Sequence, residues 1–469
     1  MKWEQLLCAK RPREYSGQVK NVDDLRSEFE KDYHRIIGSA SFRRLQDKTQ
    51  VFPLDKSDFI RTRLTHSLEV SSYGKSLGQN IGEYILKYIK DPDFTWERKE
   101  EICHVLQCAG LIHDIGNPPF GHFGESAIRD WFKENLSVLE FKGKPIDQLL
   151  TEQMKEDFYH FEGNAQALRL VTKLHYLVDE YGMNLTYALL NTIVKYPVPS
   201  TGIDKTTGNI KDKKMGYYLA DEEMFLAIAK ETGTEGMRHP LTFILEAADD
   251  IAYKTADIED AYVKGFLTYH QLREALRELQ EKEPENPFKP LERLEHKYQS
   301  GVKRNVNHPE EYAVKNWIVQ AQGFLISCAT YGFTSNYRAI MEGAYKKDIF
   351  EGTYAQGLMD LLGNLAFQKV FSTAAIYKME VTESHILRFL MNLFVRAIVN
   401  YDTEEELNAI DKRVVALISE NYKSAYHHHA DGKDEIEKLY LRLLLVTDYI
   451  CGMTDSYAKR LYQELKLGL

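Results

Sequence analysis

The sequence predicts an all-α protein, and two observations lead to that prediction. Apolar residues recur every three or four positions through most of the chain, as in Val70, Leu77 and Ile81, which is the spacing of one helix face. Runs in which apolar and polar residues alternate, as in a half-buried strand, are scarce. We therefore expect a helical core and an additional C-terminal helical block.

Composition limits the class of protein. The 469 residues carry a net charge of −10, and 43% are hydrophobic, which is ordinary for a globular chain. A protein whose main task is to coat nucleic acid is excluded by the negative charge. The N-terminus lacks the apolar run of a signal peptide, and the five cysteines contain no CxxC pair. We expect a soluble cytoplasmic protein without membrane spans or disulfides.

Breaks in the helical pattern suggest how the chain is organised. Four stretches are irregular: 51–60, 114–121, 196–216 and 282–309. We predict three regions: an N-terminal segment and core over 1–275, a solvated Lys/Glu-rich connector over 276–309, and a C-terminal helical region over 310–469.

Two helices and the break between them contain the first candidate chemistry. His66 lies on an amphipathic helix, and His113-Asp114 ends a second, apolar helix immediately before the Gly/Pro-rich break. A mixture of nitrogen and oxygen donors suits a divalent ion of the Mg, Mn, Fe or Zn kind better than calcium. A lone His-Asp pair is a weak signal, because most histidines are hydrogen-bonded packing residues.

A third helix is expected to start after Gly121. It places His122 and Glu125 three residues apart, so the two side chains are neighbours. Glu125 could accept a hydrogen bond from His122, orient the ring and raise its basicity. The alternative role of Glu125 is to stabilise the helix N-terminus through the macrodipole.

The order of the motifs resembles a known family. Together with EAADDIAY (246–253), these segments supply the pattern H…HD…D of the HD superfamily of metal-dependent phosphohydrolases. Longer strings resemble one branch of it, the deoxyguanosinetriphosphate triphosphohydrolases (dGTPases). The matching strings are FRRLQDKTQVFPL (42–54), RTRLTHSLEV (61–70), the 110–125 block, HFEGNAQALRL (160–170), IVKYP (193–197), EAADDIAY and DYICGMTDSYA (448–458). The resemblance implies an HD-domain helical core.

The resemblance also implies a metal site. Its four ligands would be His66, His113, Asp114 and Asp249, holding one divalent ion, Mg, Mn or Fe. Asp250 is the alternative to Asp249. Spacing favours Asp249, which shares one helix face with Tyr253 and Asp257, whereas Asp250 points about a quarter of a turn away.

Further site residues follow from the same resemblance. His122 is implied to be the acid/base or nucleophilic histidine, with Glu125 as its partner. Gln50 would reach the 3′-hydroxyl, Tyr253 would pack against deoxyribose, and Asp257 is expected to point into the same pocket. The residues implied to bind the triphosphate are Arg63, Asn164, Lys195, Tyr196 and Lys214. His160 and Glu162 resemble further pocket residues. In the last string, Gly452 and Asp455 are interpreted as packing and helix-capping residues.

The implied activity is hydrolysis of a deoxynucleoside triphosphate (dNTP). With dGTP favoured, the products would be deoxyguanosine and inorganic triphosphate. The resemblance also implies a homo-oligomer, with a hexamer expected. The expected effector is single-stranded DNA, bound by the Lys-rich loop 196–216 and the C-terminal helical block, or a dNTP. The alternatives are an HD hydrolase with another or broad dNTP preference under allosteric control, and a nucleotide sensor with little turnover. The intact His122–Glu125 pair argues against the sensor.

Overall fold

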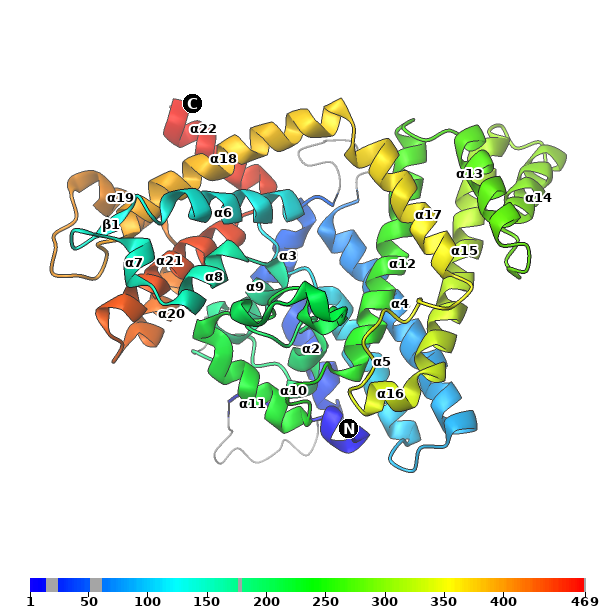
Figure 1. The fold of residues 1–469 in the computed structure, drawn as a ribbon, viewed down its shortest axis with the longest axis horizontal. Helices are drawn as coiled ribbons and strands as arrows, with labels where there is room; N and C mark the ends of the chain where they lie inside the picture. The colour runs from blue at the N-terminus through cyan, green and yellow to red at the C-terminus, as the bar shows by residue number, and fades with distance from the viewer. Residues whose placement is uncertain (14–23, 51–60, 176–178, 468–469) are drawn as a thin grey trace.

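The computed structural model describes residues 1–13, 24–50, 61–175 and 179–467, which are predominantly helical (Figure 1). The predicted all-α fold is confirmed. The strands of this described part form one small hairpin of β1 (Glu140–Phe141) and β2 (Lys144–Pro145), antiparallel, with Phe141 opposite Lys144. The irregular stretch expected at 51–60 lies outside the described residues.

Two long helices form the centre of the molecule, α4 (Arg63–Tyr84) and α5 (Trp96–Ile112). Helix α4 begins where Thr62 caps it with a capping box. The two helices approach closely because Gly110 faces Ser71: a Cβ on Gly110 would lie 2.5 Å from the Ser71 Cα. This close approach brings the start of α4 beside the end of α5.

Helix α12 (Pro240–Val263) packs against both central helices. Proline at its first position fits a helix start, where the missing N–H has no intrahelical role. The other helices of the N-terminal half surround this three-helix centre. They are α1 (Trp3–Leu6), α2 (Glu28–Ile37), α3 (Ala40–Arg44), α6 (Gly121–Asn135), α7 (Ile146–Leu149), α8 (Glu152–Tyr159), α9 (Gly163–Arg169), α10 (Tyr187–Thr192) and α11 (Glu222–Thr232).

The stretch 196–216 is irregular, as expected. It contains the 3₁₀ turns η4 (Ser200–Gly202), η5 (Lys205–Thr207) and η6 (Ile210–Asp212). It runs past the centre of the molecule, and Gly216 donates from its backbone to the carbonyl of Val198 at 3.0 Å. This bond joins the two ends of the stretch, which therefore forms a loop and not a helix.

The expected solvated connector over 276–309 is wrong for most of its length. Helix α13 (Tyr269–Lys282) continues into it, and α14 (Pro290–Lys303) occupies its middle. Leu279, Phe288 and Leu294 are buried there. Lys and Glu are abundant in this stretch, but its apolar residues recur at helical spacing. They form a stripe that packs against the following helix, α15 (Pro309–Ser335).

The C-terminal helices flank the centre on two sides. On one side α15 (Pro309–Ser335) packs against α12 and α4, followed by α16 (Tyr337–Met341) and α17 (Gln356–Ala366), as Figure 1 shows. On the other side α18 (Ala374–Ile398) lies along α6. The chain ends with α19 (Ala409–Leu417), α20 (Glu420–Ala430), α21 (Glu435–Cys451) and α22 (Asp455–Leu467).

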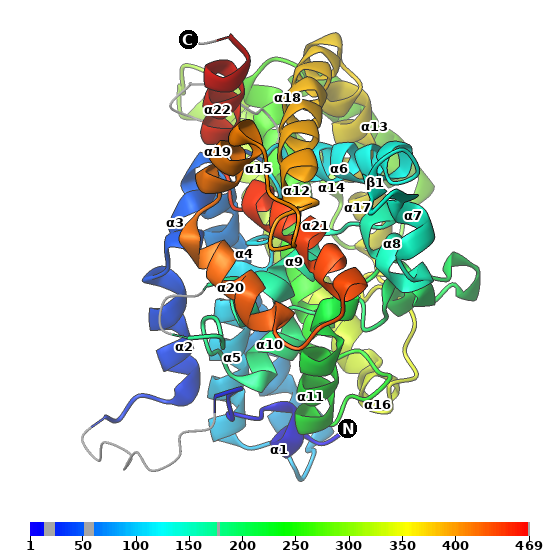
Figure 2. The same ribbon diagram turned by 90° about the vertical axis from the view of Figure 1, so that its left-hand side faces the viewer.

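One apolar core joins the two halves of the chain. Leu106 of α5, Ile251 of α12, Trp317 of α15 and Leu443 of α21 belong to the same buried cluster. Figure 2 shows α20 and α21 lying across the N-terminal helices. The two halves are therefore separate in the sequence but pack together in the fold. Among the described helices, none combines the length and low charge that a membrane span requires.

Candidate active site

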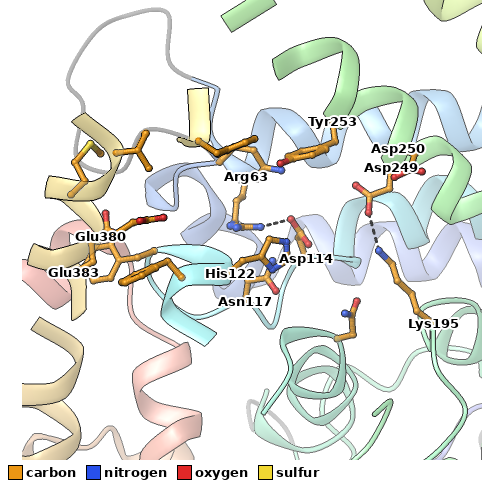
Figure 3. A pocket seen from close by; sticks show the side chains of 17 residues that line it. Arg63, Asp114, Asn117, His122, Lys195, Asp249, Asp250, Tyr253, Glu380 and Glu383 are labelled. Atoms are coloured by element: carbon orange, nitrogen blue, oxygen red, sulfur yellow. Dashed lines mark hydrogen bonds and ion pairs between the residues drawn. The ribbon is translucent and has the colours of Figure 1, made fainter. Parts of the chain in front are cut away.

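A cavity of about 400 Å³ lies where the two halves meet (Figure 3). Its polar wall comes from the start of α4, the loop after α5, the starts of α6 and α9, and α12. The polar side chains that line this wall include Gln50, Arg63, Asp114, Asn117, His122, Asn164, Lys195, Asp249 and Asp250. The cavity therefore contains most residues of the predicted site.

Three donors converge beside the cavity: Asp249 lines it, and the buried His66 and His113 contact Asp249 from outside the lining. His66 Nε2 lies 3.1 Å from Asp249 Oδ1, and His113 Nε2 lies 3.4 Å from the same oxygen. The ligand atoms of these three residues all lie within 4.8 Å of one another. Nitrogen and carboxylate donors at this spacing fit one divalent ion.

The tautomer of His113 is set by its surroundings. Its Nδ1 lies 2.8 Å from the carbonyl oxygen of Gly110 in the preceding turn, so Nδ1 donates and Nε2 keeps its lone pair. Nε2 is buried, and no residue in the described part of the chain forms a hydrogen bond with it. A buried, unpartnered imidazole nitrogen beside a carboxylate is what a metal ligand requires in the absence of the metal.

Asp114 lies at the edge of this cluster. Its Oδ1 is 3.7 Å from His113 Nε2, and its Oδ2 forms an ion pair with Arg63. Burial raises the pKa of Asp114, but the charges of Arg63 and His113 outweigh burial and hold the pKa below its usual range. Asp114 is therefore a carboxylate, and it is placed to join the three converging donors.

The neighbouring acid Asp250 lines the cavity but points differently from Asp249. It lies 3.4 Å from Lys254, four residues along α12, and burial raises its pKa to about 6. Asp249 instead contacts both histidines. The geometry favours Asp249 as the ligand, as the helical spacing did.

Two cations accompany the acids. Lys195 Nζ lies 2.8 Å from Asp249 Oδ2, and the carboxylate outweighs burial to raise the pKa of Lys195. Arg63, the other cation, is 3% exposed and pairs with Asp114. Each predicted carboxylate ligand thus has its own positive partner within the cavity wall.

His122 and Glu125 form the hydrogen bond that their spacing predicts. His122 Nδ1 lies 3.1 Å from Glu125 Oε2, while Glu125 Oε1 accepts from the backbone N–H of Gly163 at 2.8 Å. The hydrogen bond and charge of Glu125 raise the pKa of His122. Glu125 is 2% exposed and fixed, whereas His122 faces the open cavity.

Glu162 lies directly behind this pair. Lys214 Nζ donates to Glu162 Oε1 at 2.5 Å, and Arg129 lies 3.6 Å from Glu162 Oε2. Burial and the charge of Glu125 raise the pKa of Glu162. Lys214 is therefore held by Glu162 outside the cavity lining, although sequence analysis placed it among the phosphate ligands.

The remaining predicted substrate residues divide into two groups. Gln50, Asn164 and Tyr253 line the cavity. Tyr196 and Asp257 are buried and do not line it. The expectation that Asp257 points into the pocket is therefore wrong: it lies one turn along α12, hydrogen-bonded to Tyr253, and burial raises its pKa to about 8.

The two loosely assigned residues also separate. His160 lies 3.0 Å from Glu156 and lines a different, surface depression with Ser200 and Lys205. Glu162 is buried behind the His122–Glu125 pair. His160 is thus not part of the main cavity.

The cavity wall opposite the His66–His113–Asp249 cluster was not predicted from the sequence. It is formed by apolar and acidic side chains that precede and open α18, on the far side of the cavity from Asp249 and Lys195 in Figure 3. These residues are Phe371, Ile376, Met379, Glu380 and Glu383. Residues of an amphipathic helix that lie far in sequence from the recognised motifs at 246–253 and 448–458 carry no local signal, and the fold alone brings them here.

Comparison with known proteins agrees with this geometry. The model of the HD domain family matches residues 63–191, which contain two of the three converging donors. A deoxyguanosinetriphosphate triphosphohydrolase-like protein of Listeria monocytogenes is 47% identical over 99% of both chains. A deoxyguanosinetriphosphate triphosphohydrolase of Yersinia enterocolitica is 32% identical over 99% of this chain and 98% of its own. A triphosphohydrolase-like protein of Synechocystis is 32% identical over 99% of both.

The fold and the site together define an HD-domain protein of the phosphohydrolase class. With identity above 30% along essentially the whole chain, the protein belongs to the deoxyguanosinetriphosphate triphosphohydrolase family of the HD superfamily.

Proposed function

We propose that this protein hydrolyses deoxynucleoside triphosphates, with dGTP as the favoured substrate, to the deoxynucleoside and inorganic triphosphate. One observation carries the proposal: Asp249, which belongs to the cluster of metal-binding donors, and His122, which Glu125 orients, line the same cavity. A substrate in that cavity would meet both a metal and a proton carrier. The names of the relatives support the substrate class.

His66, His113, Asp114 and Asp249 would hold the divalent ion, and Mg, Mn or Fe fits the donor set. When bound, the ion supplies Lewis-acid stabilisation of phosphate charge and an activated water. The unpartnered Nε2 of His113 supports this assignment independently of the family, because a buried polar atom without a partner costs stability unless a ligand satisfies it.

His122 would transfer the proton. The 5′-oxygen of the deoxyribose leaves as an alkoxide when water attacks the α-phosphorus, and the imidazolium form of His122 can protonate it. Glu125 favours that form, since it raises the pKa of His122. Glu125 acts as a positioning residue, and its own bond to the Gly163 N–H fixes its second oxygen.

The cations would bind the triphosphate. Arg63 and Lys195 face the cavity beside the cluster, and Asn164 adds an amide donor. A guanidinium and an ammonium held in a largely buried wall bind phosphate oxygens more strongly than exposed side chains do. Tyr196 and Lys214 remain part of the proposal, as residues that support the binding surface from behind.

The sugar would lie against α12. Tyr253 presents its ring to the cavity, and the hydrogen bond with Asp257 holds its hydroxyl. A fixed ring excludes a 2′-hydroxyl by sterics, and Gln50, whose buried Oε1 has no partner among the described residues, is available for the 3′-hydroxyl. The deoxyribose preference therefore depends on residues already ordered in this structure.

Products distinguish this proposal from its alternatives. The protein is incubated with Mg²⁺ or Mn²⁺ and each dNTP in turn, and phosphorus NMR identifies the phosphate released. Triphosphate, with dGTP turned over fastest, is the expected result. Comparable rates for all four dNTPs would indicate broad specificity, and nucleotide binding without products, even with mixed dNTPs or single-stranded DNA added, would indicate a sensor. The homo-oligomer, the hexamer and the effector stay predictions.

A further inference from the structure

The loop between the predicted ligand Asp114 and His122 is held from behind by two buried, oppositely charged side chains. Lys48 and Asp455 are each 2% exposed, and neither lines the cavity. One precedes the cavity residue Gln50 by two positions, and the other opens the helix α22.

Lys48 joins the loop to the C-terminal helices. Its Nζ donates to the carbonyl oxygen of Asn117 at 2.6 Å and to that of Cys451, also at 2.6 Å. Cys451 is the last residue of α21, where unpaired carbonyls and the helix dipole favour a cation. The ammonium is thus bound at once to the loop and to the end of a C-terminal helix.

Asp455 provides a second attachment of the loop to the C-terminal helices. Its Oδ1 accepts from the backbone N–H of Phe120 at 2.9 Å, and its Oδ2 accepts from the N–H and the hydroxyl of Thr49 at 2.9 and 2.8 Å. Its position at the first residue of α22 is favourable for a carboxylate, because a helix N-terminus carries partial positive charge. Besides lying at the start of α22, as the capping interpretation predicts, Asp455 binds Phe120 and Thr49.

The loop requires such support because its backbone is strained. Phe120 has φ of 64°, in the left-handed region that residues with a side chain rarely adopt. The next residue but one is His122, so relaxation at Phe120 would displace the imidazole and the start of α6. The N–H that Asp455 accepts belongs to the strained residue itself.

We propose that Lys48 and Asp455 are positioning residues that hold loop 114–121 in its active conformation, and that the start of α22 is consequently part of the active site. This inference rests on the proposed function for its kinetic consequence, but its structural consequence can be measured separately. It also gives a role to the DYICGMTDSYA string, which contains Cys451 and Asp455 and has no chemical role that is evident from the sequence.

The test compares Asp455→Asn with Asp157→Asn. Asp157 is a matched control: it is fully buried and accepts three hydrogen bonds, from Ser200, Leu219 and Tyr440, but it does not touch the loop. Asp455→Asn should lower kcat about 10²-fold, with KM and bound metal little changed, because misplacement by about 1 Å has costs of that order. Asp157→Asn should keep kcat near that of the wild type.

Amide hydrogen exchange supplies the readout that does not depend on turnover. Peptides covering 114–124 should exchange faster in Asp455→Asn and at the wild-type rate in Asp157→Asn. If the wild-type protein hydrolyses no dNTP, the proposed function fails and exchange alone decides this inference. Native exchange in folded Asp455→Asn, or an equal loss of kcat in both variants, would overturn it.

A milder variant covers the case in which Asp455→Asn does not fold. Thr49→Val removes only the hydroxyl donor to Asp455 and keeps the backbone bond. It should raise exchange over 114–124 and lower kcat by a smaller factor than Asp455→Asn. Wild-type exchange and wild-type kcat in Thr49→Val would contradict the inference.

Discussion

His122 is the residue on which the proposed chemistry depends most, and a single carboxylate controls its proton affinity. Glu125 is fixed by Gly163 and raises the pKa of His122, so the imidazolium persists to higher pH than it would alone. His122→Ala should lower turnover by about 10²–10⁴-fold without changing metal content. Substantial metal loss in this variant, measured by elemental analysis, would contradict the separation of roles.

The pH profile tests the link between the two side chains. Replacing Glu125 by Gln removes the charge that raises the His122 pKa, so the protonated form is lost at lower pH. The alkaline limb of kcat/KM should therefore shift downward in Glu125→Gln. Asp130→Asn removes an exposed carboxylate from the same helix and is the control. An unshifted limb in Glu125→Gln would rule out His122 as the acid.

Glu383 gives a prediction about stability. Burial raises its pKa from 4.5 to about 8, and its Oε1 has no hydrogen-bond partner within the ranges that the structure describes. The folded protein therefore binds a proton that the unfolded chain releases above pH 4.5, and this contribution to stability is lost progressively as pH rises to about 8. Glu383→Gln cannot ionise, so its Tm relative to wild type should increase between pH 5 and pH 8.5. A Tm difference that does not change with pH would show that Glu383 is ionised in the folded state.

Among the helices, the ends of two were predicted from the sequence, but the presence of one helix was not. The helix ending at Ile112 and the helix starting after Gly121 were expected from an apolar run and a Gly/Pro break, and both are present. The helix α14 was missed because its Lys and Glu residues resemble a linker in composition. Only the spacing of its few apolar residues identifies it as a packed helix.

The loop after α5 provides a prediction about close packing. Gly116 faces α9 so closely that a Cβ there would lie 2.1 Å from the backbone nitrogen of Ala167. Gly116→Ala must displace the loop or the helix, and both contribute to the cavity. We expect loss of activity together with a stability loss of about 1–3 kcal/mol, measured by denaturant unfolding.

A second glycine serves as the matched control. Gly323 lies inside α15 with no atom within 4 Å of an added Cβ. Gly323→Ala should keep full activity and raise stability by about 0.5–1 kcal/mol, the helix preference of alanine over glycine. Equal behaviour of the two variants would contradict the packing argument.

At the scale of the whole molecule, the sequence specified one side of the cavity and not the other. His66, His113, Asp249, His122 and Glu125 lie in short motifs whose spacing on a helix or at its end carries meaning. The wall of Phe371 to Glu383 has no such pattern. Lys48 binds Cys451, and Thr49 binds Asp455, only because α21 and α22 fold back onto the N-terminal half. Packing between segments far apart in the sequence brings this wall, Cys451 and Asp455 to the site, and no local spacing of residues predicts such packing.

Metal binding should be visible in the stability of the entire fold. An ion that binds only the folded state at about 100 times its Kd adds about 2.7 kcal/mol, so chelation should lower Tm and added Mn²⁺ should restore it. His113→Ala should remove most of this response. His160→Ala, outside the cavity, should retain it. A wild-type Tm that is indifferent to chelator and metal would contradict the proposed site.

The central claim is that water attacks the α-phosphorus in this cavity and the 5′-oxygen leaves. Turnover of dGTP in ¹⁸O-labelled water, followed by phosphorus NMR and mass spectrometry of both products, measures this directly. The account predicts one labelled oxygen in the inorganic triphosphate and none in the deoxyguanosine. Label in the 5′-hydroxyl of deoxyguanosine, or pyrophosphate in place of triphosphate, would contradict it.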